Sequence, residues 1–134
     1  MKASKRALQA LLDGEKFLRP WGFRVVRAGA AGCTVELPHQ EALERPGGII
    51  NGPALMAAAD VAMWLAIKVR LGMKHDALTS ELNTSFLAPA RSEHVYCTAR
   101  ILKLGRRRIY GVAECHGGGG RLFSHHTVTY VRPD

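Results

Sequence analysis

The sequence predicts an α+β fold in which an antiparallel sheet of five or six strands wraps around one long central helix. The first observation is a nearly continuous apolar segment at residues 51–71, because a helix that is apolar on most sides must be buried. The second is a set of six strand-like runs, two before this segment and four after it. The sheet needs its apolar face covered, and this helix is the only element able to cover it.

The chain before the long helix predicts a short helix, two strands and a loop. Residues 4–12 begin with a capping serine and carry a stripe of three leucines, which is typical of a short surface helix. Residues 22–27 and 32–37 have the composition of strands, with a turn around Gly29 between them. Residues 38–48 contain two prolines and a Gly-Gly pair, which predict a loop.

The long helix has start and stop signals of its own. Asn51 suits the N-cap, and Pro53 lies in the first turn, where its missing N–H has no intrahelical use. Six alanines favour the helix, and Gly72 suits its end. Nearly every residue in 54–67 is apolar, so we expect this helix to be buried on most of its circumference.

Four strand-like runs follow the helix, and we expect them to pair as an antiparallel meander. Their connections are short and rich in turn residues, as in hairpins. No repeat or linker divides the chain, so residues 1–134 are expected to form a single hotdog domain, the name for a sheet wrapped around one helix. The four runs are residues 78–88, 94–103, 107–116 and 121–132.

The composition restricts the partners of the chain. Its net charge of +8 favours nucleic acid, an anionic membrane or a phosphorylated ligand such as coenzyme A. No aromatic residues are interleaved with the basic ones and no nucleic-acid motif is present, so nucleic acid is not expected. Neither a membrane span nor a signal peptide is expected, because no apolar run reaches the length of a span and no convincing cleavage site follows the N-terminus.

The cysteines and histidines favour a reducing compartment and no metal site. Cys33, Cys97 and Cys115 are odd in number and widely spaced, so we expect buried thiols and a cytoplasmic location. His125 and His126 would point to opposite faces of a strand, and no zinc-ligand spacing is present. No metal and no resident cofactor are therefore expected.

Asp60 is the strongest candidate for chemistry, because its helical neighbours are apolar and cannot pair with a charge. At the start of the helix, the Gly52 N–H is free at the positive end of the helix dipole and could polarise a carbonyl oxygen. The two positions are about 12 Å apart along one helix, by the rise per residue. A second copy across a two-fold axis could bring Asp60 of one helix near Gly52 of the other.

These residues also carry a family resemblance. The stretch RPGGIINGPALMAAADVAMWLAI, residues 45–67, resembles the helix-start motif of hotdog thioesterases of the phenylacetate-pathway type, most closely a branch with Gly-Pro at this position. That motif reads Gly, two residues, His-Gly-Gly and then Asp nine residues after the His. Here Asn51 takes the place of His, and Asp60 falls at the right distance. The stretches TSELNTSFLAPA and TVTYVRP resemble the family's next and last strands.

The resemblance implies an acyl-CoA thioesterase. Gly52 N–H would polarise the thioester carbonyl, and Asp60 would act as nucleophile or as general base on water. Thr79 or Ser80 of a partner subunit would help to place the water or the carboxylate. Asn51 cannot take up a proton as histidine can, but it can donate a hydrogen bond to the substrate or cap the helix.

Further residues are candidates for binding the substrate. On an alternating strand Glu81 shares a face with Thr79, which would add a second carboxylate near the site. Trp64 could line an acyl pocket between the helix of one subunit and the sheet of another. Four arginines are candidates for the coenzyme A phosphates, with a solvated basic rim as the alternative: Arg91, Arg106, Arg107 and Arg108.

We therefore expect an enzyme that hydrolyses acyl-CoA or aryl-CoA thioesters as a homodimer or a dimer of dimers, with coenzyme A present only as part of the substrate. The alternative is a hotdog domain that binds or senses acyl-CoA without catalysis, since a fold does not determine a function. A dehydratase ranks lower, because that reaction typically uses a histidine with a carboxylate and the motif contains no histidine.

Overall fold

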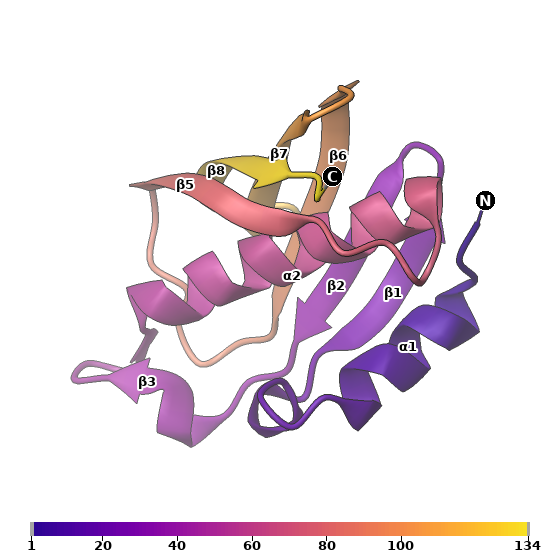
Figure 1. Cartoon of the computed structure of the whole chain (residues 1–134). Helices are drawn as coiled ribbons and strands as arrows, with labels where there is room; N and C mark the ends of the chain where they lie inside the picture. Colours follow the sequence, from indigo (N-terminus) through magenta and orange to yellow (C-terminus); the bar gives the residue numbers. More distant parts are fainter. Residues whose placement is uncertain (1, 134) are drawn as a thin grey trace.

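The central feature of the computed structural model, which describes residues 2–133, is a six-stranded antiparallel sheet that curls around helix α2 (Gly52–Leu71) (Figure 1). The strand order is β1-β2-β6-β7-β8-β5. The predicted hotdog architecture is therefore confirmed. The six strands are β1 (Arg24–Gly29), β2 (Gly32–Leu37), β5 (Leu78–Phe86), β6 (Val95–Leu104), β7 (Arg108–His116) and β8 (Leu122–Val131).

The smaller elements lie outside this sheet. Helix α1 (Lys5–Gly14) is capped by Ser4, as predicted. It is joined to the start of β1 by Gln9, whose side chain accepts a hydrogen bond from the Val25 N–H and donates one to the Phe23 carbonyl. The other elements are the 3-10 helices η1 (Arg19–Trp21) and η2 (Glu41–Leu43) and the paired two-residue strands β3 (Glu44–Arg45) and β4 (Ile49–Ile50).

Helix α2 begins and ends where the sequence predicts. Asn51 is its N-cap, Pro53 lies in the first turn, and Gly72 closes it at a φ of +108°. Twelve of its residues are buried. The close approach of helix and sheet depends on Gly111 of β7, because a Cβ there would lie 2.4 Å from Cε of Met63. One stripe of α2 is only partly covered, and it consists of Met56, Ala57, Asp60 and Trp64.

The expected four-strand meander is only partly correct. Strands β6, β7 and β8 pair consecutively, but β5 pairs with β8 and forms an edge of the sheet. The reason is the connection at residues 87–94, which is not a tight hairpin. It passes the N-terminus of α2, where Ala90 accepts a hydrogen bond from the Ile50 N–H.

Strand β5 carries a bulge that changes which side chains face α2. Thr79 is opposite Tyr130 and Glu81 is opposite Thr129, so Ser80 is an extra residue in the ladder. The bulge restarts the alternation of faces, so Thr79 and Glu81 lie on opposite faces. The expectation that they share a face was therefore wrong.

Two sequence predictions concern the chain as a whole. Among residues 2–133, no helix is long and apolar enough to cross a membrane. The three cysteines are free and buried, as expected.

Candidate active site

The Asp60 carboxylate is held by two hydroxyl groups from the sheet. Tyr130 of β8 and Thr79 of β5 each donate a hydrogen bond to Oδ1, both at 2.7 Å. Oδ2 has no hydrogen-bond partner among residues 2–133. The absence of partners on the helix itself is confirmed, but the sheet supplies two that anchor one oxygen of the carboxylate and leave the other free.

The Tyr130 hydroxyl keeps its proton and so remains a hydrogen-bond donor to Asp60. Burial, and then the negative charge of Asp60, raise the pKa of Tyr130 well above its ordinary value. The phenol therefore stays protonated over the range in which enzymes work, and its proton points at the carboxylate.

A cavity of about 270 Å³ adjoins Asp60. Its wall is apolar on one side, where Trp64 and Val61 of α2 meet Leu78 of β5 and the exposed side chain of Phe17. A second carboxylate, Asp76, also lines this cavity. The lining combines an apolar surface with one partly free carboxylate, an arrangement suited to holding an apolar group beside a reactive oxygen.

Gly52 lies in a different cavity, of about 440 Å³, at the N-terminus of α2. Its N–H has no acceptor among the described residues 2–133. The ring of Phe86 covers this glycine so closely that a Cβ at position 52 would lie 2.9 Å from the ring. A side chain at position 52 would therefore displace the exposed Phe86 ring. The free N–H of Gly52 adds to the positive end of the helix dipole.

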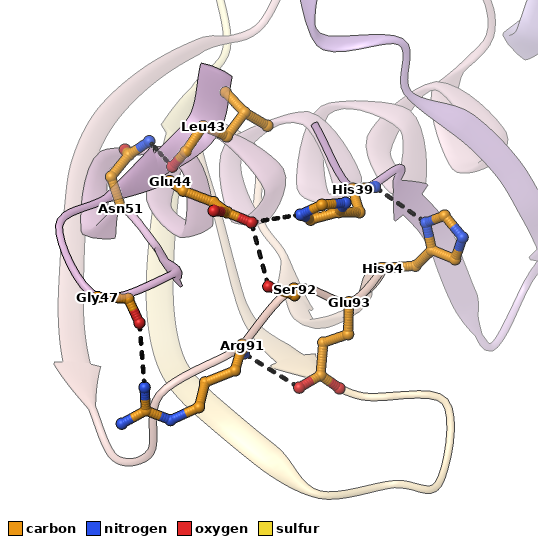
Figure 2. A network of polar contacts seen from close by, with 9 residues as sticks. All are labelled: His39, Leu43, Glu44, Gly47, Asn51, Arg91, Ser92, Glu93 and His94. Carbon is orange, nitrogen blue, oxygen red and sulfur yellow. Dashed lines mark hydrogen bonds and ion pairs between the residues drawn. The ribbon is translucent and has the colours of Figure 1, made fainter. Parts of the chain in front are cut away.

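Asn51 is the N-cap of α2 and also bonds the loop that contains Leu43, the second contact being drawn in Figure 2. Its Oδ1 accepts a hydrogen bond from the Ala54 N–H at 2.9 Å, and its Nδ2 donates to the Leu43 carbonyl at 2.7 Å. Both ends of the amide therefore have structural partners within the chain. Of the two roles considered for Asn51, the capping role is the one seen in the geometry.

Gly52 and Asp60 line separate cavities within one chain. This separation agrees with their spacing of about 12 Å along the helix. One bound carbonyl cannot meet both groups of the same chain.

The side chains of β5 differ from what the family resemblance implied. Thr79 bonds Asp60 of its own chain, whereas the resemblance placed it in the site of a partner. Ser80 is the bulge residue, and its hydroxyl donates to the Thr129 carbonyl at 3.3 Å. Glu81 lies on the face of the sheet away from α2, so its carboxylate is not near Asp60.

Residues 47–124, more than half of the chain, match the family described as the thioesterase superfamily. The chain belongs to the thioesterase superfamily. The matched region contains Gly52, Asp60 and Thr79, while Tyr130 lies beyond it. The finer assignment to a phenylacetate-pathway branch stays a prediction.

Individual proteins and solved structures resemble most or all of the chain. A Thermoplasma acidophilum protein named "Putative esterase" is 29% identical over 119 residues, covering 89% of this chain and 88% of that protein. A Silicibacter protein described as a "putative thioesterase" superposes with a TM-score of 0.89 at 28% identity, covering 98% of this chain and 93% of its own. A Haemophilus influenzae thioesterase superposes with a TM-score of 0.90 at 19% identity, covering 100% of this chain and 93% of its own, which shows likeness of fold alone.

The arginines that are candidates for binding coenzyme A lie in two separate groups. Arg106 and Arg107 line a cavity of about 480 Å³ together with Arg132, whose backbone N–H donates to the Arg107 carbonyl at 2.7 Å. Arg108 begins β7 beside them. Arg91 lies near the N-terminus of α2, where its Nη1 donates to the Gly47 carbonyl at 3.2 Å.

Several residues that line these two cavities are absent from the predicted site, among them Phe17, Asp76, Tyr130 and Arg132. Tyr130 had a usable signal, because strand alternation places it on the same face as Val128 and His126. Phe17 and Asp76 lie in connections, where no periodicity indicates what they contact.

Proposed function

We propose that the protein hydrolyses acyl-CoA or aryl-CoA thioesters at a site shared between two copies of the chain. The observation that carries the proposal is the Asp60 carboxylate, anchored at Oδ1 by two hydroxyls and free at Oδ2 beside a partly apolar cavity. Membership of the thioesterase superfamily supports this reaction class.

A homodimer is supported by the surface around Asp60. The half-buried stripe of α2 contains Met56 and Trp64 as well as Asp60, and the neighbouring edge strand exposes 72% of Leu78 and 56% of Phe86. An edge strand with exposed apolar side chains favours pairing with another chain. We propose that the second copy covers this stripe and this edge, and that pairs of such dimers can assemble further.

The two-fold arrangement explains the distance between the two reactive groups. Met56 is midway between Gly52 and Asp60 on α2. If two α2 helices cross antiparallel near Met56, Asp60 of each chain meets Gly52 of its partner. Each dimer then has two identical sites.

The proposed reaction uses these groups in distinct roles. Gly52 N–H donates to the thioester carbonyl oxygen and stabilises the negative charge that develops there. Asp60 either attacks the carbonyl carbon, forming an anhydride that water then hydrolyses, or removes a proton from the attacking water. Tyr130 and Thr79 hold Oδ1 so that Oδ2 faces the substrate. The products are the free acid and coenzyme A, whose thiolate takes up a proton.

The remaining candidate residues are assigned to substrate binding. We propose that Trp64 contacts the acyl group in the cavity beside Asp60. Arg106 and Arg107, with Arg108 and the newly located Arg132, form a cationic surface for the phosphates of coenzyme A, and Arg91 is a second candidate at the other end of α2. Coenzyme A enters as part of the substrate, and the proposed chemistry needs no other cofactor.

The test is release of free thiol from a panel of acyl-CoA and aryl-CoA thioesters, combined with binding measurements on the same compounds. We expect the protein to release thiol faster than the uncatalysed reaction does for at least one class of thioester. Binding without thiol release across the whole panel would instead favour a domain that binds or senses acyl-CoA.

A further inference from the structure

Two loops meet at the N-terminus of α2 and form a polar network there (Figure 2). The first loop contains β3 and β4, and the second connects β5 to β6. Hydrogen bonds between them limit how far either loop can move. These bonds run from Ile50 N–H to Ala90 O at 2.9 Å, from Ser92 N–H to Gly48 O at 3.3 Å, and from Arg91 Nη1 to Gly47 O at 3.2 Å.

The direction of the Gly52 N–H depends on Asn51, because the peptide group that joins the two residues is planar. The two donor groups of Asn51 share one acceptor, while its Oδ1 and its carbonyl oxygen accept from the Ala54 N–H. Both its backbone N–H, at 2.9 Å, and its side-chain Nδ2, at 2.7 Å, donate to the Leu43 carbonyl. The position of the Leu43 carbonyl, together with the contacts of Asn51 to the Ala54 N–H, therefore contributes to the orientation of the Gly52 N–H.

Glu44 follows Leu43 directly and is held by side chains from two segments. Its Oε2 accepts a hydrogen bond from Nε2 of His39 at 2.5 Å and one from the hydroxyl of Ser92 at 3.3 Å. Glu44 also pairs with Ile50 across the β3–β4 ladder, one residue before Asn51. Glu44 is thus held through its carboxylate by His39 and Ser92, and its backbone pairs with the residue that precedes Asn51.

The first loop has little regular structure of its own. The β3–β4 ladder has two residue pairs, and the turn between its strands contains Gly47 and Gly48, both at positive φ. Ser92 has a φ of +43°, a region that residues with side chains seldom occupy. Such a conformation persists where surrounding contacts hold it, and here the N–H and the hydroxyl of Ser92 are both bonded to the first loop.

We propose that Glu44, held by His39 and Ser92, is a positioning residue that aims the Gly52 N–H at the substrate carbonyl. The proposal rests on the thioesterase function proposed above. Glu44 acts through Leu43 and Asn51 and does not touch the substrate. A wrongly aimed donor stabilises the transition state less, while its effect on the binding of the substrate is smaller. The loss therefore falls on kcat rather than on KM.

The kinetic test compares Glu44→Gln with Glu114→Gln. Glu114 forms the same kind of pair with His125, at 2.8 Å, on the sheet face away from α2, so it is a matched control. We expect Glu44→Gln to lower kcat about tenfold or more with KM changed less than about threefold, since one oxyanion donor contributes at least that much. Glu44→Asp, which keeps the carboxylate, should recover part of the loss, and Glu114→Gln should match the wild type. A kcat for Glu44→Gln within about twofold of the wild type, or an equal loss in the control, would overturn the proposal.

A second measurement needs no turnover. The amide resonance of Gly52 in a ¹H–¹⁵N spectrum reports the surroundings of its N–H directly. It should move in Glu44→Gln and stay in place in Glu114→Gln. If the wild type hydrolyses no thioester, the proposed function fails by itself, and the Gly52 resonance still decides whether Glu44 positions this group. An unchanged resonance in Glu44→Gln refutes the positioning role.

Discussion

The hydroxyl of Tyr130 lies 2.7 Å from Oδ1 of Asp60 and 3.0 Å from the carbonyl oxygen of the same residue. This contact joins the last strand of the sheet to the middle of α2. It accounts for how a carboxylate is kept on a mostly apolar helix: the sheet satisfies one oxygen and leaves the other available.

Tyr130→Phe should weaken catalysis without abolishing it. The change removes one of two donors to Oδ1, and a hydrogen bond to a charged group contributes about 1.5–3 kcal/mol, so kcat should fall roughly 10- to 100-fold. Steady-state kinetics on the best thioester substrate provide the measurement. Tyr110→Phe, at an exposed position on β7, is the control and should leave kcat unchanged. Full activity in Tyr130→Phe would show that Thr79 alone suffices to hold the carboxylate.

Asp60→Asn should fold and lose nearly all turnover. Asparagine has almost the same shape and can still accept hydrogen bonds from Tyr130 and Thr79 through its amide oxygen. It can neither attack the thioester nor remove a proton from water, so turnover should fall at least roughly a hundredfold. Thiol release and a thermal unfolding curve should be measured on the same preparation. A variant that keeps near-normal activity would remove Asp60 from the chemistry.

Gly52→Ala should lower activity through a steric conflict. The new Cβ would lie 2.9 Å from the Phe86 ring, so the ring, which lines the same cavity as Gly52, must shift. We expect kcat/KM to fall about tenfold or more, the cost of a disturbed oxyanion donor. Gly14→Ala is a suitable control, because no atom lies within 4 Å of a Cβ built at that position in α1. Equal activity in both alanine variants would argue against a role for the Gly52 N–H.

The His39–Glu44 pair should contribute stability that is lost in acid. The hydrogen bond from His39 lowers the pKa of Glu44 below its ordinary value of 4.5. The unfolded chain therefore binds a proton at this site more readily than the folded protein does. The contribution is complete above a pH of about 4.5 and disappears as the pH falls through the lowered pKa.

Urea unfolding of the wild type and Glu44→Gln, at about pH 6 and about pH 3, measures this contribution. The wild type should be more stable at the higher pH, and the difference should shrink at the lower one. A difference that is the same at both pH values would mean that the charge of Glu44 is not its source.

The sequence predicts the elements of this fold better than their order in the sheet. Helix α2 follows from an apolar pattern with Asn51 and Gly72 at its ends, which are local signals. The position of β5 beside β8 depends on contacts between segments far apart in the chain. No local pattern distinguishes it from a meander.

Local patterns also miss the details of the site. The bulge at Ser80 has no signature in the residues TSE, although it decides that Glu81 faces away from Asp60. Tyr130 is 70 positions from Asp60, so the partner of the carboxylate could not be read from the helix. Gly52 and Asp60 could be predicted as candidates because both lie on one helix and their spacing is local.

The most direct test of a shared site is to mix two impaired variants. Asp60→Asn keeps an intact Gly52, and Gly52→Ala keeps an intact Asp60. If the two groups act across the two-fold, a mixed dimer regains one complete site. When equal amounts of the two variants pair at random, about half of the dimers are mixed, and one of the two sites in each mixed dimer is complete. Up to about a quarter of the wild-type number of sites should then be restored.

The measurement is thiol release after the two variants are unfolded and refolded together, compared with each variant refolded alone. We predict activity well above the sum of the separate variants and approaching that quarter. Activity no greater than the sum, in a sample shown to contain mixed dimers, would contradict a site built from Asp60 of one chain and Gly52 of the other.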